Sequence, residues 1–471
     1  IQQGKLDAVE KPLIDYAIAH PREVKALELL ARLRYRQDRL EEAKALYQRV
    51  LALDPSFVIA KINFAQLTYG LGQRDSARLL LAEVTSAPAL SPGERLSLAR
   101  ALVLVGEFQK ALAVADKLPA AVKNGSALPL MAASYAGLDD RKSLMALVPS
   151  IKRAASSNPE IAAECAEIFQ KAGLSQEALG LLRLALARAP NNFRLLVSLG
   201  QMETSVGNFA EARRLLNRAV KLNPRTPISF FSIGLLESAE GNYAAALSNL
   251  KQARALAPRS PSILTQLTLN AMQAGQPQAA VEAANELLQL KPDDPEFLYL
   301  FGAASLQNGS LGPAQSALQR YQQQRPDDPR GCLALGIAFA GQPGQQQEAK
   351  SQFEQCSKLD PTNVEPRYQL GLIFKSEGEG AKAVQLFEEV ITLAPKHANA
   401  LRDLGALYLQ TGDEAKARAV LERAAALNSQ DAETHFLLSR VYSLTGERTL
   451  AQQHLDLFQK LKSQREKQPR P

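Results

Sequence analysis

Side chains of the kinds that carry catalysis or bind metal are few in this sequence. The four histidines are His20, His397, His435 and His454, and none forms a His-x-x-x-His pair or lies beside a cysteine at a metal-ligand spacing. There is no glycine-rich phosphate loop and no Gly-x-Ser-x-Gly nucleophile turn. The carboxylates are spread at helical surface spacing, as on solvated helix faces. We therefore predict no active site, no metal and no cofactor, and expect that the chain is not an enzyme.

Three cysteines leave a second kind of chemistry, disulfide formation. Cys165 falls at a core-facing position, where a cysteine most simply packs as a small apolar side chain. Cys332 and Cys356 fall on the two helices of one expected hairpin, at heights that match in an antiparallel pair. Two buried thiols are the simpler interpretation, and a disulfide is the alternative. A disulfide would indicate an oxidising compartment.

The elements that would position any site follow a 34-residue period, clearest between Pro159 and Asp328. An alanine recurs at this period, with a glycine five residues before it and a proline twelve residues after it. The positions are Ala178, Ala212, Ala246, Ala280 and Ala314, with Gly173, Gly207, Gly241, Gly275 and Gly309, and with Pro190, Pro224, Pro258, Pro292 and Pro326. A period of this length predicts a solenoid of stacked supersecondary units.

Each unit has the pattern of a helical hairpin. Between the glycine and the proline, Phe209, Ala212 and Leu216 form the apolar stripe of an amphipathic helix, and a second stripe precedes the glycine. Glycine adopts the turn conformation without a Cβ penalty, and proline ends the second helix. The alanine lies at the closest helix crossing, where a small side chain is needed.

These residues resemble the tetratricopeptide repeat, whose 34-residue pattern has small residues at the crossing and a closing proline. The resemblance extends through nearly the whole chain, with further anchors at Ala43, Ala77, Ala111, Leu144, Ala349, Ala383, Ala417 and Ala451. It implies an all-α fold, a right-handed α-solenoid of about thirteen helix-turn-helix repeats, of the type found in bacterial superhelical members. Such a fold implies binding but names no ligand.

The quality of the pattern divides the chain. We expect residues 1–23 to be a partial repeat that keeps only its second helix, so that upstream sequence has been removed. Residues 24–158 form an N-terminal block whose repeat at 123–158 is degraded; it is either a flexible joint or a drifted repeat that still packs. Residues 159–463 form a regular block ending in a capping helix, with one residue inserted in the turn of the repeat at 329–363. Residues 464–471 are a basic tail.

Charge and hydropathy argue against a nucleic-acid partner and against a transmembrane segment. The net charge is +7, but the segment from Lys460 to the C-terminus contributes +4 of it, and the remainder forms no basic stripe. We therefore expect no nucleic-acid partner. No apolar run has the roughly 18 residues that a membrane span needs, so we expect no transmembrane segment. The oligomeric state stays open, and so does the compartment, with an exported, periplasmic location weighed against the cytoplasm.

In the tetratricopeptide repeat family the first helix of each repeat lines an inner groove. The resemblance therefore implies three groove zones. The first zone is Lys25, Glu28, Arg32 and Arg36, and the second is an acidic cluster of Glu160, Glu164 and Glu167. The third is an apolar and aromatic lining of Phe231, Leu235, Leu269, Met272, Tyr299, Leu333, Tyr368, Leu372 and Phe436. These residues either anchor a peptide or pack against neighbouring first helices.

The function that this resemblance implies is a non-catalytic scaffold or adaptor that binds a protein partner through an extended or helical peptide segment. Neither the Lys/Asn/Arg set of the chaperone-binding clamp nor the groove asparagine ladder of the sugar-transferase type is present. Three alternatives stay open: the substrate-selecting arm of a larger enzyme, a bacterial envelope assembly factor, and a designed repeat protein.

Overall fold

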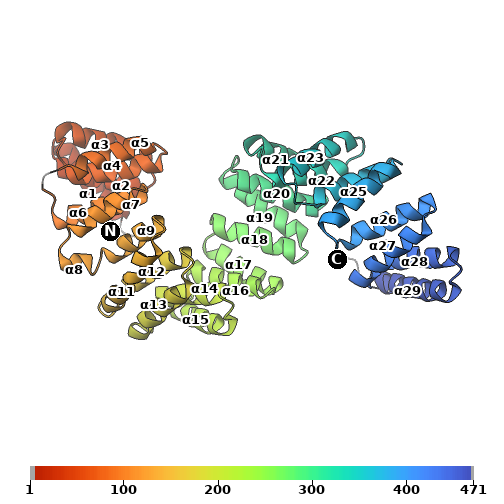
Figure 1. Ribbon diagram of the computed structural model, residues 1–471. Coiled ribbons are helices and arrows are strands. Elements are labelled where there is room, and N and C mark those ends of the chain that lie inside the picture. The colour runs from red at the N-terminus through yellow and green to blue at the C-terminus, as the bar shows by residue number, and fades with distance from the viewer. Residues whose placement is uncertain (1–5, 88, 468–471) are drawn as a thin grey trace. The chain divides into compact units, whose positions relative to one another are not determined.

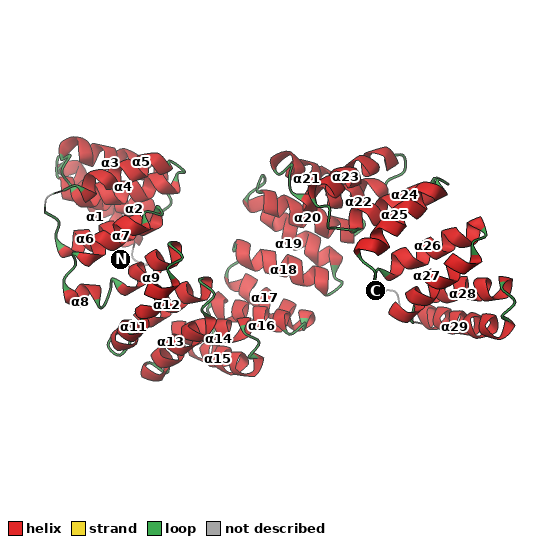
Figure 2. Ribbon diagram, in the orientation of Figure 1, coloured by secondary structure: helices red, strands yellow, loops and turns green. Residues whose placement is uncertain are grey.

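The computed structural model describes residues 6–87 and 89–467, with side chains between residues 10 and 464 apart from residue 88. Throughout these ranges the chain forms helices joined by loops, without a strand (Figure 2). Figure 1 shows these helices coloured along the chain, from α1 near the N-terminus to α29 near the C-terminus.

The helices up to the middle of the chain are α1 (Leu6–Ala19), α2 (Val24–Arg36), α3 (Leu40–Leu53), α4 (Val58–Gly70), α5 (Arg74–Thr85), α6 (Pro92–Leu104), α7 (Phe108–Asp116), α8 (Ala120–Lys123), α9 (Leu128–Gly137), α10 (Arg141–Ala146), α11 (Val148–Ala154), α12 (Pro159–Lys171), α13 (Ser175–Arg188), α14 (Phe193–Ser205), α15 (Phe209–Leu222) and α16 (Pro227–Ala239). The later helices are α17 (Tyr243–Leu256), α18 (Pro261–Gln273), α19 (Pro277–Leu290), α20 (Pro295–Gln307), α21 (Leu311–Gln324), α22 (Pro329–Ala340), α23 (Gln346–Leu359), α24 (Glu365–Ser376), α25 (Gly380–Leu393), α26 (Ala398–Thr411), α27 (Glu414–Leu427), α28 (Ala432–Leu444) and α29 (Arg448–Lys467).

Consecutive helices pack as hairpins, for example α18 on α19, α20 on α21 and α22 on α23. The first helices of successive repeats also contact one another, α18 with α20 and α20 with α22. This arrangement confirms the predicted all-α solenoid, in which each repeat buries its apolar faces against its neighbours.

The helix crossings depend on small residues. Ala246, Ala280 and Ala314 are completely buried, as the period predicts. Opposite the last of these anchors, a Cβ on Gly302 would lie 2.5 Å from Leu318 Cγ. A larger residue at position 302 would therefore have to displace the Leu318 side chain, so the close packing of α20 on α21 depends on glycine there.

The turns require a left-handed backbone. Gly309 has a φ of +72° and is typical of the repeats, because glycine reaches this region without strain. Asp139 takes the same place in the degraded repeat with a φ of +55°, and Asp38 does so in the first full repeat with a φ of +61°. Asp tolerates this region better than most residues, so both turns are preserved without glycine.

The degraded repeat packs without a break in the core. Its second helix is divided into α10 and α11, with Pro149 in the first turn of α11. A continuous core cluster nevertheless runs from Leu128 through Leu144 and Ile151 to Ala219. This packing favours the drifted repeat over the flexible joint as the interpretation of the segment.

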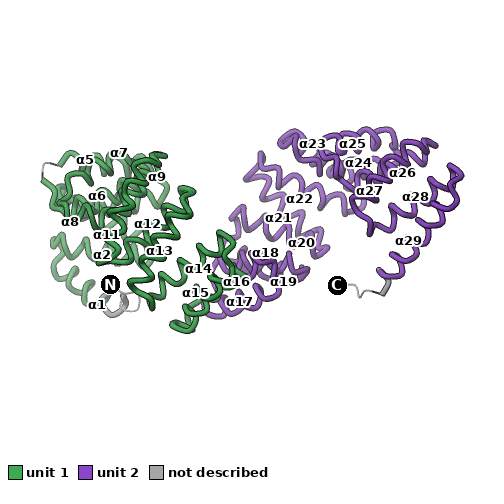
Figure 3. The backbone as a smooth tube through the Cα atoms, turned by 60° about the horizontal axis from the view of Figure 1, so that its bottom comes forward, with its two compact units in different colours: residues 1–236 green, residues 237–471 purple. Residues whose placement is uncertain are grey.

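The chain forms two compact units, residues 1–236 and residues 237–471 (Figure 3). The block boundary at residue 158, which the sequence pattern favours, is a boundary of repeat regularity and lies within the core of the first unit. α1 packs on α2. At the other end, α29 extends to Lys467, so residues 464–467 of the segment expected to be a basic tail are helical; residues 468–471 lie outside the described residues. No described helix is both long and apolar enough for a membrane span.

Candidate peptide-binding groove

The second unit contains a pocket on the face formed by its first helices. The pocket has a volume of about 360 Å³ and lies between α20, α22 and the loop that joins α23 to α24. We call it the groove pocket. It is lined by Tyr299, Ala303 and Leu306 of α20, by Pro329, Arg330, Leu333, Ala334 and Ile337 of α22, and by Asp360 and Asn363 of the loop.

The apolar lining arises from the repeat register. Leu269, Ala303 and Ile337 occupy one position in three successive first helices, and Met272 and Leu306 occupy another. Leu269 is 39% exposed and Ile337 is 38% exposed. Leu306 and Leu333, which lie between Leu269 and Ile337 in the sequence, are half-buried. An open apolar surface of this kind is typical of a binding groove.

Arg330 forms the polar edge of the pocket. Its guanidinium lies 4.9 Å from the centre of the Tyr299 ring, and it forms ion pairs with Glu296 at 3.1 Å and with Asp328 at 2.8 Å. It also donates a hydrogen bond of 2.9 Å to the hydroxyl of Tyr321. These contacts fix the side chain in one place, so Arg330 is a positioned charge at the edge of an apolar surface.

The same contacts shift the acid–base properties of the neighbouring groups. Hydrogen bonds from Arg330 hold the pKa of Asp328 well below its usual range, with a further contribution from the Tyr321 hydroxyl. Burial raises the pKa of Tyr321, and its hydrogen bond to Asp328 raises it further. Burial also raises the pKa of Tyr299. Both tyrosines are therefore neutral, and Tyr321 donates a hydrogen bond to Asp328 and accepts one from Arg330.

Comparison with known proteins identifies the family. Two family models, both described as the tetratricopeptide repeat, match the chain: one at residues 34–92, 271–331 and 374–441, the other at residues 2–56, 164–224 and 205–261. The chain belongs to the tetratricopeptide repeat family.

Three solved structures illustrate the matches at low sequence identity. The Cut9–Hcn1 hetero-tetramer of APC/C is 14% identical with a TM-score of 0.42, over 89% of this chain and 96% of that chain. A tetratricopeptide repeat protein from Parabacteroides merdae is 19% identical with a TM-score of 0.46, over 53% and 98%. Yeast Tom70 is 14% identical with a TM-score of 0.40, over 94% and 96%. These likenesses concern the fold alone. A search of curated protein sequences gave no match.

Not all of the expected groove residues of this tetratricopeptide repeat chain are accessible. Tyr368 is only 7% exposed, donates its hydroxyl to Asp403 at 3.0 Å and packs against the rings of Phe387 and His397. It belongs to the core between repeats, and Leu372 packs against the same core cluster. Of the two roles that the sequence left open for Tyr368, this burial favours packing between repeats over anchoring a peptide.

The other aromatic positions differ among themselves. Phe436 is 39% exposed on α28 and packs against Phe458 of the capping helix. Phe231 and Leu235 are half-buried on α16, which begins in the first unit. Tyr299 and Leu333 are the two expected groove residues that line the groove pocket. The recurring aromatic residues thus do not form one uniform strip.

The charged groove zones of the first unit are partly occupied by internal contacts. Glu160 accepts a hydrogen bond from Asn192 at 3.0 Å and pairs with Arg194 at 3.3 Å, whereas Glu164 and Glu167 lie exposed on α12. In the first repeat, Glu28 is buried and accepts a hydrogen bond from Asn63 at 2.8 Å. Burial raises the pKa of Glu28, opposed by the charge of Arg32 and the bond from Asn63. Lys25, Arg32 and Arg36 are exposed on the same helix.

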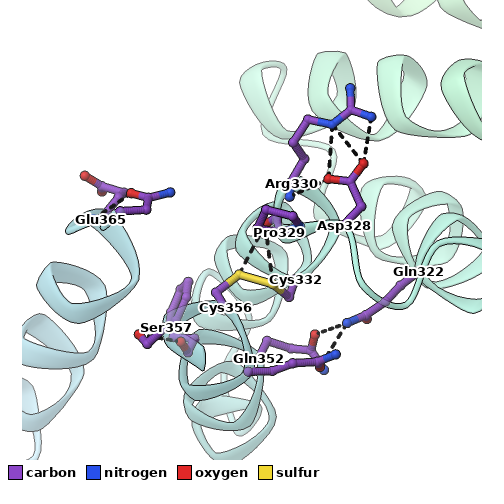
Figure 4. The surroundings of a disulfide bond; sticks show 12 residues. Gln322, Asp328, Pro329, Arg330, Cys332, Gln352, Cys356, Ser357 and Glu365 are labelled. Carbon is purple, nitrogen blue, oxygen red and sulfur yellow. Dashed lines mark hydrogen bonds and ion pairs between the residues drawn. A yellow bond between two sulfur atoms is a disulfide. The ribbon is translucent and has the colours of Figure 1, made fainter. Parts of the chain in front are cut away.

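The cysteines form one disulfide and one buried thiol. Cys332 and Cys356 form a disulfide, with their Cα atoms 5.7 Å apart (Figure 4). Of the two arrangements that the sequence left open, two buried thiols or a disulfide, the structure therefore has the disulfide. Burial raises the pKa of the Cys165 thiol to about 12, with a smaller contribution from Glu164, so this thiol is inert. Among the residues that the structure describes, no group of three His, Cys, Asp or Glu side chains is placed to hold a metal ion.

Eight of the ten residues that line the groove pocket, all except Tyr299 and Leu333, were not expected from the sequence. Ala303, Leu306 and Ile337 could have been found, because each stands one or two periods of 34 residues after Leu269 or Met272. Asp360 and Asn363 carried no such signal. They come from a loop, and only the packing of the hairpin brings them to the pocket.

Proposed function

We propose that this chain is a non-catalytic protein-interaction scaffold that binds a peptide segment of its partner, extended or helical, in the groove pocket. The supporting observation is the set of accessible aliphatic side chains on successive first helices, Leu306, Leu333 and Ile337, beside the fixed charge of Arg330. Apolar anchors in a pocket supply most of the affinity of such interfaces, and the charged edge selects orientation. The peptide expected here has two or more aliphatic residues next to polar ones.

The test is selection from a displayed library of random peptides against the intact protein. Selected peptides should share aliphatic residues. Their affinity should fall by about tenfold or more in Leu306→Glu and Ile337→Glu, because an uncompensated carboxylate would be desolvated in the contact. Leu393→Glu is the matched control, since Leu393 is 54% exposed on a second helix of the same unit and lies outside the pocket.

The outcome that refutes this function is equally definite. Selected peptides that bind both pocket variants as tightly as the unmodified protein would place the binding surface elsewhere. Circular dichroism of the three variants separates lost binding from lost folding, because all three positions lie on helices.

One alternative gains support from the cysteines. A disulfide is characteristic of proteins that fold in an oxidising space, which fits an exported assembly factor better than a cytoplasmic adaptor. This alternative shares the peptide-binding role and differs in where the partner is met. The substrate-selecting arm of an enzyme has no comparable observation in its favour, and a bacterial origin stays a prediction from the sequence pattern.

A further inference from the structure

The disulfide lies at the end of a hairpin where the groove pocket begins. Cys332 is in the first turn of α22 and Cys356 is in the last turn of α23, so the bond joins the open end of the hairpin, opposite its turn. Pro329 and Arg330, which begin α22, and Asp360 and Asn363, which follow α23, all line the pocket.

Contacts around the bond connect it directly to a pocket wall. Both sulfur atoms lie close to the backbone oxygen of Pro329, Cys332 Sγ at 3.4 Å and Cys356 Sγ at 3.2 Å (Figure 4). The next residue, Arg330, carries the charged edge of the pocket. A change in the separation of the two helices at this end would therefore move pocket residues on both walls.

Other repeats fill these two positions with apolar contacts. The preceding hairpin has Leu298 and Tyr321 there, and both belong to one buried cluster. The hairpin before it has Leu264 and Leu287, which are also buried. In α22 and α23 the two small cysteines offer much less apolar surface, so a covalent bond takes the place of that packing.

The same hairpin has the longer turn. Residues 341–345 join α22 to α23, whereas residues 308–310 join α20 to α21 and residues 377–379 join α24 to α25. A longer connection restrains the two helices less at that end. The hairpin whose first helix supplies half of the residues lining the groove pocket is thus the one with less restraint at its turn and a covalent bond at its open end.

We infer that the Cys332–Cys356 bond is a staple that holds the groove pocket in its peptide-binding shape, so that binding there depends on the oxidised cysteines. The inference rests on the proposed function of the pocket. Without the bond, the loop carrying Asp360 and Asn363 is free to move away from α22. Ordering it again on binding costs affinity, because a pre-organised site needs less ordering than a mobile one.

The experiment compares oxidised protein, protein reduced with a water-soluble phosphine, and the double variant Cys332→Ala/Cys356→Ala. The phosphine is oxidised to its oxide with oxygen from one water molecule, and its two electrons and the two protons of that water convert the disulfide to two thiols. The ligand is the tightest peptide from the library selection. We expect about fivefold or greater loss of affinity in the reduced and double-variant proteins. Cys165→Ala is the control and should bind as the unmodified protein does, since Cys165 lies in the first unit.

Hydrogen exchange supplies a reading that needs no peptide. Loss of the bond should raise amide exchange in residues 360–364 and at the start of α22, while α18 and α26 keep their protection. Equal exchange and equal affinity in all forms would overturn the staple, and so would three free thiols in the untreated protein, counted by alkylation and mass spectrometry after denaturation. If the Leu306 and Ile337 substitutions leave the peptide affinity unchanged, the proposed function fails. Amide hydrogen exchange then still decides whether the disulfide holds the groove pocket in shape.

Discussion

Arg330 and Asp328 show how single residues tie the electrostatics of the groove pocket to its helix geometry. Asp328 caps α22 by accepting the backbone N–H of Arg330 at 2.9 Å, and it also pairs with the guanidinium of the same residue. A cap and an ion pair on one carboxylate fix both the first turn of α22 and the charge at the pocket edge.

This pairing makes a pH-dependent prediction. The pKa of Asp328 is depressed in the folded state, so its contribution to stability is present above the unfolded pKa of about 4 and is lost as the pH falls toward the folded value. Asp328→Asn keeps a capping oxygen but removes the charge. At pH 7 the unmodified protein should be more stable by about 0.5–1 kcal/mol, a value limited by solvent screening, since the Arg330 side chain is 46% exposed.

Urea unfolding at pH 7 and pH 3 measures this difference. The gap between the two proteins should narrow at the lower pH, where the carboxyl of the unfolded chain is protonated. An equal difference in unfolding free energy at pH 7 and pH 3 would mean that the charge of Asp328 contributes nothing to stability.

At the residue scale, the sequence left open which groove candidates are buried, because their burial depends on a partner in another repeat. Tyr368 and Tyr299 have equivalent places in their helices, yet the first is buried and the second lines a pocket. The difference is Asp403, which lies 35 residues after Tyr368 and accepts its hydroxyl. Nothing within a single repeat distinguishes the two tyrosines.

At the scale of elements, the sequence was far more informative. Hairpins, turns and crossings follow from local requirements: a residue tolerant of positive φ at the turn, a small residue at the crossing, and an apolar stripe on each helix. The degraded repeat keeps its place because Asp139 satisfies the turn and Leu144 remains buried. The boundary between compact units had no such local signal, since it depends on how densely neighbouring helices pack.

The crossing on α17 gives an element-scale prediction. Ala246 is completely buried, so Ala246→Leu should overpack the hairpin and lower the free energy of unfolding by about 1–3 kcal/mol. Ala239→Leu is the control, because Ala239 is exposed at the end of α16. Chemical denaturation measures the loss, and hydrogen exchange should confine it to the repeats next to α17. Loosening spread evenly along the described chain would contradict a solenoid with local contacts.

For the whole molecule, the division into two units places every residue of the groove pocket in the second one. A fragment of residues 225–471, which keeps α16 complete, should therefore fold and bind the selected peptide with the affinity of the full chain. Circular dichroism and titration calorimetry test both points. We expect lost protection in α16 alone, whose packing partner α15 is removed. Binding that requires the first half would place part of the site outside the groove pocket.

The polar contacts between repeats have a consequence for how such a chain finds its own order. A protein made of near-copies risks joining a helix to the wrong copy, since the apolar surfaces are interchangeable. Tyr368 with Asp403 and Glu28 with Asn63 are different chemical pairs, each joining one repeat to the next. A hairpin docked out of sequence would leave one of these groups buried without a partner. These polar pairs thus favour contact between the correct neighbouring repeats, and so they let a repetitive chain assemble in a single order.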